Sequence, residues 1–268
     1  MQTLCIIGDG SLSARESVAD RLAEATNKRV ATVDQTAESV AATDNGSADG
    51  TFRIDGDGRW AGSGTNRSVM ELLDSLSTDY DYALVAGLAH HRLPTVVIGD
   101  AETPPSAEIV ASAPTADALD IASIVDRLDD LEPHITLETL VERAKASPKA
   151  ERSGAIATFT GRVRAKDSPD DTRTEHLAFE KYEGVAEDRL EAIRQDLTGR
   201  DGVFEVLLHH RVGLMNDGED IVFVVVLAGH RKEAFRTVED GIDRLKDEVP
   251  IFKKETTTDE EFWLHERE

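Results

Sequence analysis

Short apolar runs alternate with helical patterns through the first 130 residues, and this alternation constrains the fold most strongly. The strand-like runs are Gln2–Ile7, Arg29–Val33, Tyr82–Leu88 and Thr95–Ile98. Helical spacing of apolar residues marks Ser13–Ala25, Val69–Leu76 and Ala116–Leu128. Residues 42–66 are rich in Gly, Asp, Ser and Asn and predict a hairpin or loop around Trp60. Residues 1–130 are therefore predicted to form an α/β domain with an open, mainly parallel sheet.

The pattern changes near Leu131–Pro133. A helix is expected over residues 135–146, and Pro148 ends it. The strand-like segments that follow are Ala155–Arg162, Thr174–Tyr182, Val203–Val212 and Asp220–Leu227. The helical ones are Ala186–Leu197 and Lys232–Val249. Few strands with two long helices predict an α+β domain over residues 131–268.

The charge of the chain narrows the classes of partner. Acidic residues outnumber basic ones 53 to 30, which gives a net charge of −23, spread evenly over both halves. Nucleic acid and anionic membranes are excluded as partners, because no broad face could neutralise phosphates. Such even acidity is typical of a halophile's surface, where salt screens the repulsion. No signal peptide and no apolar run near 18 residues is present, so we expect a cytoplasmic protein.

The single cysteine, Cys5, lies in an apolar run and is interpreted as a small core residue. No disulfide within the chain and no cysteine-based zinc site can form. The adjacent His90 and His91 would need a third ligand to chelate a metal, so they are interpreted as polar surface residues. We therefore expect neither a metal nor a cofactor.

The loop after the first strand, residues 8–13, has the position of a phosphate-binding loop but lacks its key residues. No Gly-Lys-Ser/Thr follows Gly8, and the third glycine of a dinucleotide fingerprint is absent. Residues 79–88, which read DYDYALVAGL, resemble a strand of the MobB family of P-loop accessory proteins, except that Ala86 replaces its acidic residue. The resemblance implies a degenerate MobB-like, P-loop-type domain, and a plain strand-to-helix turn is favoured.

Lysine is scarce, and its clustering needs a reason. Three of the nine lysines lie within residues 246–254. Lys246 is expected in the last turn of a helix that Pro250 stops, with Lys253 on an extended segment beyond. A helix end followed by a strand can bring both ammonium groups to one pocket, where they would suit an anionic substrate.

Two further basic pairs lie at element boundaries. Arg162 and Arg164 end a strand with a spacing of two, so both would point to one side and could grip a phosphate. His230 and Arg231 begin a helix, where the dipole and free N–H groups favour anions. With Lys246 and Lys253 counted separately, these pairs give four basic groups in so acidic a chain, and together they predict an anion-binding site.

Residues from about Pro133 to Glu268 resemble the MoaE family, the large catalytic subunits of molybdopterin synthase, in the order and spacing of their motifs. The matching segments are 158–164 (TFTGRVR), 177–182 (LAFEKY), 210–213 (HRVG), 229–231 (GHR), 245–255 (LKDEVPIFKKE) and 263–267 (WLHER). The resemblance implies an α/β-hammerhead fold and the conversion of cyclic pyranopterin monophosphate, precursor Z, into molybdopterin. Sulfur would come from the C-terminal Gly-Gly thiocarboxylate of a MoaD-like, ubiquitin-like small subunit.

The same resemblance implies a role for each matching residue. Lys246 would act at the thiocarboxylate, by holding it, by transferring protons or through a transient acyl link, and Lys253 would bind and polarise the pterin. The implied substrate-binding residues are Phe159, Arg162, Val163, Arg164, His230, Arg231, Lys254, Glu255 and Arg267. Arg267 could serve the site of a neighbouring protomer. The implied assembly is a homodimer within a heterotetramer, with a small subunit at each end.

Two alternatives remain open from the sequence. The chain could be a non-catalytic scaffold for enzymes of molybdenum cofactor biosynthesis, although retention of both lysines argues against it. A P-loop GTPase is disfavoured by the missing Lys and Ser/Thr of the phosphate loop. A nucleotide-binding assay on residues 1–130 would separate these classes.

Overall fold

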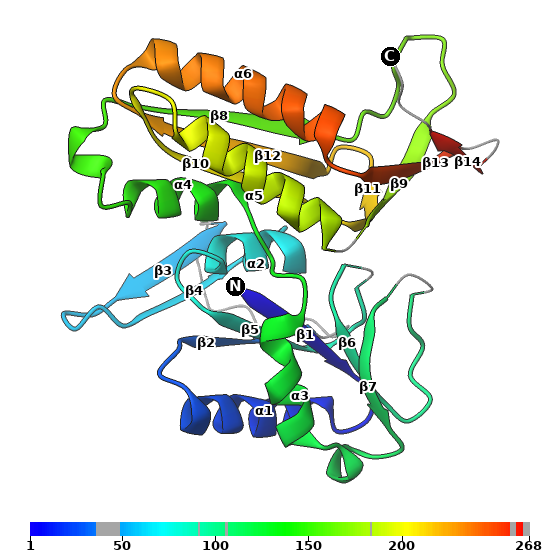
Figure 1. Cartoon of the computed structure of the whole chain (residues 1–268). Helices are drawn as coiled ribbons and strands as arrows, with labels where there is room; N and C mark the ends of the chain where they lie inside the picture. The colour runs from blue at the N-terminus through cyan, green and yellow to red at the C-terminus, as the bar shows by residue number, and fades with distance from the viewer. Residues whose placement is uncertain (36–48, 91, 105–106, 183, 258–260, 265–268) are drawn as a thin grey trace. The chain divides into compact units, whose positions relative to one another are not determined.

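A computed structural model describes residues 1–35, 49–90, 92–104, 107–182, 184–257 and 261–264 of the chain, the last four by backbone alone (Figure 1). The chain divides into two compact units, Met1–His134 and Ile135–Glu268. His91, Arg267 and the first part of the predicted 42–66 loop lie outside the described residues. Each unit is described by itself.

The first unit is built on a five-stranded parallel sheet in the order β2-β5-β1-β6-β7. Its strands are β1 (Gln2–Ile7), β2 (Val30–Asp34), β5 (Tyr82–Gly87), β6 (Thr95–Ile98) and β7 (Ile109–Ala113). Its helices are α1 (Ser11–Ala25), α2 (Val69–Leu76) and α3 (Ile121–Arg127), with short 3₁₀ turns η1 (Ala116–Ala118) and η2 (Leu128–Asp130). The predicted open parallel sheet is confirmed.

Helices cover both faces of this sheet. Along β1, Leu4 and Ile6 pack on one face with residues of α1 and α3, whereas Cys5 and Ile7 pack on the other with Leu73 of α2. Alternate side chains of a strand point to opposite faces, so a strand buried on both sides must be apolar throughout. Burial also raises the pKa of the Cys5 thiol to about 11, which agrees with its interpretation as a core residue.

The turn after β1 is tight. Only three residues separate β1 from α1, and the Ser11 N–H donates to the Gly8 carbonyl at 3.2 Å. Gly8 has φ +97°, and a Cβ there would lie 2.0 Å from the Ile98 carbonyl oxygen. A Cβ on Gly87, the last residue of β5, would likewise clash with the Gln35 carbonyl oxygen. Glycine at these positions allows two backbone segments to pack closely. This packing accounts for the glycine in the turn after β1 without a bound phosphate.

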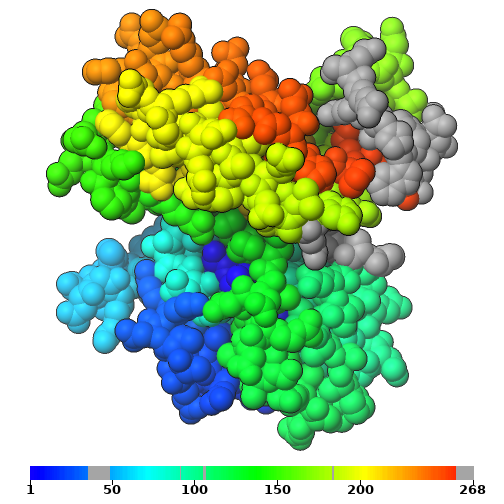
Figure 2. All heavy atoms as spheres, viewed as in Figure 1, coloured from blue at the N-terminus to red at the C-terminus, as the bar shows by residue number. Residues whose placement is uncertain are grey.

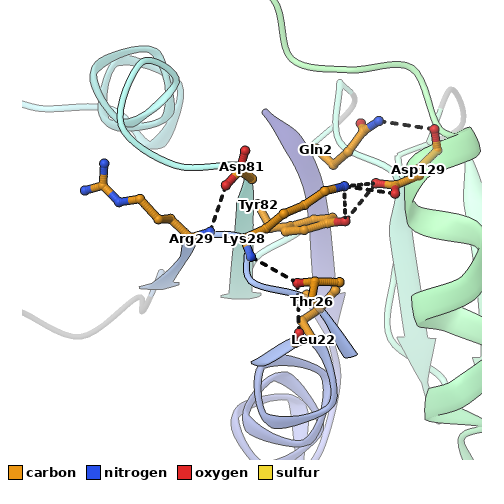
Figure 3. Close-up of polar contacts among 8 residues, drawn as sticks. All are labelled: Gln2, Leu22, Thr26, Lys28, Arg29, Asp81, Tyr82 and Asp129. Carbon is orange, nitrogen blue, oxygen red and sulfur yellow. Dashed lines mark hydrogen bonds and ion pairs between the residues drawn. The ribbon is translucent and has the colours of Figure 1, made fainter. Parts of the chain in front are cut away.

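A polar cluster joins the turn before β2 to β5 and η2 (Figure 3). The Lys28 ammonium donates to the Tyr82 hydroxyl at 2.9 Å and to Asp129 at 3.0 Å, and Tyr82 donates to Asp129 at 2.8 Å. These bonds lower the pKa of Asp129, Tyr82 contributing most, and raise that of Lys28. These hydrogen bonds connect the first residue of β5 and the turn before β2 to the 3₁₀ turn η2.

A separate hairpin, β3 (Gly50–Ile54) and β4 (Trp60–Gly64), belongs to the first unit and is light blue at the left of Figure 2. Ile54 pairs with Trp60 and Phe52 with Gly62, so the three large apolar side chains share one face. They are 61–77% exposed. The hairpin predicted around Trp60 is confirmed within the described residues.

The second unit contains two antiparallel sheets, ordered β10-β12-β8 and β11-β9-β13-β14. The strands are β8 (Ala155–Arg162), β9 (Thr174–Lys181), β10 (Val203–His210), β11 (Gly213–Asn216), β12 (Asp220–Ala228), β13 (Ile251–Thr257) and β14 (Glu261–Leu264). The helices are α4 (Leu137–Lys145), α5 (Val185–Thr198) and α6 (Arg231–Glu248), with a 3₁₀ turn η3 (Ala150–Arg152). This is the α+β architecture that the sequence predicts.

The central strand β12 carries two cores. Val222, Val224 and Val226 pack toward α5 and α6, which run along one face of the sheet (Figure 1). Phe223 and Val225 face the opposite side and pack with α4. The strand is apolar at every position from Ile221 to Ala228, as expected for a strand covered on both faces.

The structure departs from the predicted elements in one interrupted helix and in three strands. The helix expected over Ala116–Leu128 is interrupted, because Asp120 caps a new helix by accepting the Ser123 N–H. The strands β7, β11 and β14 were not predicted; β7 and β11 are short, and small or polar residues interrupt their apolar runs.

No helix within the described ranges combines the length and apolar character that a bilayer crossing demands.

Candidate functional site

A cavity of about 470 Å³ lies in the second unit, between α6, the two sheets and the segment after β8. Six of the sequence-predicted site residues line it: Phe159, Arg162, Arg164, Lys246, Lys253 and Glu255. Its apolar wall includes Leu177, Phe179 and Leu245. Four of its lining side chains are cationic and two, Asp167 and Glu255, are anionic, so its formal charge is positive in a chain of net charge −23. An anion would be attracted to this cavity.

Lys246 lies in the last turn of α6, as predicted. The helix ends at Glu248, where the Val249 N–H makes the final bond to the Leu245 carbonyl and Pro250 follows. Lys246 is exposed and, among the described residues, has no hydrogen-bond or ion-pair partner. Its ammonium group is therefore available to a ligand in the cavity.

Strand alternation sorts the basic residues of β13. Lys253 pairs with Phe179 and Glu255 with Leu177, and all four line the cavity. Lys254 points to the opposite face of the sheet, because neighbouring side chains of a strand alternate. The structure thus brings Lys253 and Glu255 to Lys246 but not Lys254.

The three residues at the end of β8 differ in their positions. Arg162 is held at the turn before β12, where its Nε donates to the Gly218 carbonyl at 3.1 Å. Arg164 lies beyond the end of β8, so strand spacing does not set its direction, and it pairs with Asp167 at 3.1 Å. Val163 is buried in a small core, and its N–H and carbonyl are bonded to Glu219 and Gly218. Val163 therefore holds the two arginines in place and offers the cavity no free group.

His230 and Arg231 begin α6, as predicted, but at the end opposite Lys246. His230 is the N-cap residue and both side chains are exposed. Lys246 lies fifteen positions after Arg231 along the helix, which corresponds to about 22 Å. The two residues do not line the cavity of their own chain. Arg267 lies outside the described residues.

Sequence reasoning did not assign four polar residues of the cavity to the site: Thr160, Asp167, Thr174 and His210. Thr174 donates to the Glu255 carboxylate. His210 ends β10 and its ring lies edge-on to Phe179, with centroids 5.0 Å apart. The family-like segment beginning at His210 was a signal for it, and the charged loop before Arg173 was a signal for Asp167.

Comparison with known proteins identifies the family. The family model described as "MoaE protein" matches residues 132–248. A relative from Haloferax volcanii, named a probable molybdopterin synthase, is 58% identical over 270 residues and covers all of both chains. The chain belongs to the MoaE family. The resemblance predicted from the sequence is thereby confirmed.

Shorter members of the family match only part of this chain. The molybdopterin synthase catalytic subunit of Pyrococcus abyssi is 36% identical over 46% of this chain and 82% of its own. A crystal structure of molybdopterin synthase from Staphylococcus aureus aligns with 51% of this chain and 94% of its own, at 31% identity and a TM-score of 0.44. The names of the relatives support the enzyme that the sequence predicts, a molybdopterin synthase catalytic subunit, over a scaffold.

Proposed function

We propose that the cavity binds cyclic pyranopterin monophosphate and that this substrate receives two sulfurs, one from each of two thiocarboxylates on MoaD-like small subunits. The observation that carries this proposal is the gathering of Arg162, Arg164, Lys246 and Lys253 on one cavity in a very acidic chain. Guanidinium groups suit the phosphate, because they form charge-assisted, bidentate bonds. The apolar wall around Phe179 and Leu245 suits the flat pterin.

The two lysines take different parts in this proposal. Lys246, exposed and without a partner among the described residues, receives the thiocarboxylate and holds its charge. Lys253 lies deeper on β13, half-buried beside Phe179, and polarises the pterin intermediate. The only cysteine is buried in the first unit, which agrees with a sulfur supply from outside the chain.

The direct test is reconstitution. The full chain is incubated with precursor Z and a small subunit that carries a C-terminal thiocarboxylate, and molybdopterin is measured. The same small subunit with an ordinary carboxylate is the control. Product with the first and none with the second is expected. No product with the thiocarboxylated subunit, despite formation of the complex, would contradict the proposal.

We also propose that His230 and Arg231 serve the cavity of a second copy. They carry the charge and helix position of an anion site, yet about 22 Å of α6 separates them from Lys246. The homodimer that the family resemblance implies would reconcile these facts. In the test, Lys246→Ala chains and Arg231→Ala chains are mixed under conditions in which the dimers exchange subunits. Mixed dimers are expected to recover activity, because one of their two sites is complete. A mixture that is no more active than either variant alone would contradict the proposal.

The first unit takes no part in sulfur transfer in this proposal. The Pyrococcus relative supports it, since a protein of which 82% aligns with under half of this chain is too short for both units. The first unit would instead dock later enzymes of the pathway. The even acidity of both units further supports a cytoplasmic protein adapted to high salt.

A further inference from the structure

His210 is a buried cavity residue with no part in the function proposed above. It is 8% exposed, pairs with Val222 in the sheet and lines the cavity from the end of β10. Its ring lies against Phe179, the residue that pairs with Lys253 in the neighbouring sheet. The imidazole is thus next to the wall on which the pterin would lie.

The hydrogen bond of His210 determines its tautomer. Its Nδ1 lies 2.6 Å from the carbonyl oxygen of Arg211. A carbonyl oxygen can only accept, so Nδ1 carries the proton and Nε2 keeps its lone pair. The Arg211 guanidinium secures this carbonyl by donating to the Asp220 carbonyl at 3.0 Å and the Ile135 carbonyl at 2.9 Å.

The imidazole stays neutral at physiological pH. Burial is the main cause that lowers the pKa of His210 to about 4; the bond to the Arg211 carbonyl opposes this, and the charge of Lys181 adds to it. The groups that face His210 do not supply a compensating carboxylate. Glu255 accepts from Thr174, and Asp167 is paired with Arg164. Nε2 has no hydrogen-bond partner among the described residues.

We propose that His210 Nε2 is the acceptor that orients the pterin ring in the cavity, by accepting a hydrogen bond from one of its N–H groups. The cationic lining side chains can only donate, and they suit the phosphate. A pterin also has ring N–H and amino donors, which need an acceptor once water is excluded. This inference rests on the proposed substrate and adds a residue that discriminates a pterin from other phosphorylated rings.

The test compares matched variants of the full chain in the reconstituted assay. His210→Phe keeps a ring and its contact with Phe179 but removes the Nε2 acceptor, together with the Nδ1–H donor to the Arg211 carbonyl. His210→Gln keeps an acceptor near the position of Nε2. His209→Phe is the control, because His209 is half-buried, stacks on Phe223 and does not line the cavity. Circular dichroism verifies that each variant is folded.

His210→Phe is expected to raise the KM for the precursor roughly 3- to 10-fold with kcat nearly unchanged, which is the loss of one neutral hydrogen bond. His210→Gln should restore most of this loss, and His209→Phe should leave KM as it is. An unchanged KM in His210→Phe, or a His210→Gln variant as weak as His210→Phe, would overturn the inference. A wild-type chain without turnover would instead overturn the proposed function.

A measurement on the wild-type chain needs no variant. The ¹⁵N resonance of His210 Nε2 is followed while precursor is added to the chain alone. A shift toward the value of a hydrogen-bonded acceptor is expected, because a new donor polarises the lone pair. A resonance that does not move while the chain binds precursor would show that the ring is oriented by other groups.

Discussion

The two units use basic residues in opposite ways. In the first unit, Lys28 is tied to Tyr82 and Asp129, and buried Arg15 is paired with Asp34. In the second, cations converge on a cavity, and Lys246 has no partner among the described residues. A basic residue at an element boundary is therefore no sign of a site by itself. A site also needs open volume and charge that the protein has not already neutralised.

The glycines sharpen this contrast. At the carboxyl edge of the parallel sheet, where α/β proteins usually bind ligands, Gly8 and Gly87 let backbone segments close on one another. In the first unit, these two contacts bring described backbone segments together at this edge. The second unit leaves about 470 Å³ between its two antiparallel sheets and α6. The experiments below ask whether chemistry follows this difference in space and charge.

The largest expected effect is that of Lys246→Ala. Sulfur transfer should fall by about 100-fold or more, the range for loss of a positioned proton-transfer or charge-holding group. The rate of molybdopterin formation measures it, with light scattering to verify the dimer. Lys28→Ala, which removes a lysine of the first unit, is the matched control and should keep full activity. Near-normal turnover of Lys246→Ala would remove the lysine from the mechanism.

Arg164→Ala should have the next largest effect. Loss of a charge-assisted bond to phosphate costs about 1.5–3 kcal/mol, or roughly 10- to 150-fold in precursor affinity. Titration calorimetry with the precursor measures it, and docking of the small subunit should be unchanged. Arg173, at the far end of the same loop, pairs with Asp217 and does not line the cavity, so Arg173→Ala is the control. Equal affinities for both variants would show that the phosphate binds elsewhere.

A smaller effect is expected in the first unit, from Asp129→Asn. Hydrogen bonds from Tyr82 and Lys28 lower the pKa of Asp129, so their stabilisation is present above its unfolded value near 3.8 and is lost as pH falls through the folded value. The variant should lose up to about 1 kcal/mol of stability at neutral pH, and progressively less as the pH falls below 3.8. Thermal unfolding from pH 7 to pH 3 measures this difference. An effect on sulfur transfer would break the separation between the units.

The smallest effect is expected from removing the first unit altogether. The fragment Ile135–Glu268 contains every residue to which we assign chemistry, so it should make molybdopterin at the rate of the full chain. The comparison is made at several salt concentrations, because so acidic a protein can unfold at low salt for unrelated reasons. A folded but inactive fragment at high salt, or GTP hydrolysis by the full chain, would contradict this division of labour.

Local signals in the sequence predicted much of the architecture. The helix stop at Pro250 placed Lys246 in the last turn of α6, and apolar runs located β1 and β12 closely. These features depend on neighbouring residues alone, so they can be read without a fold. The interruption before α3 was missed because the cap formed by Asp120 competes with an otherwise helical pattern.

The sequence by itself determined the family, the two kinds of unit and the identity of the lysines, because motif order and short-range periodicity are properties of the chain. Only the tertiary structure decided which charges share a cavity. It brought Arg164 and Lys253 together from separate elements and left His230 outside the cavity of its own chain. It also added His210, whose role depends on burial and on a ring packed from another sheet. Long-range packing creates such a site, and no local pattern of residues records it.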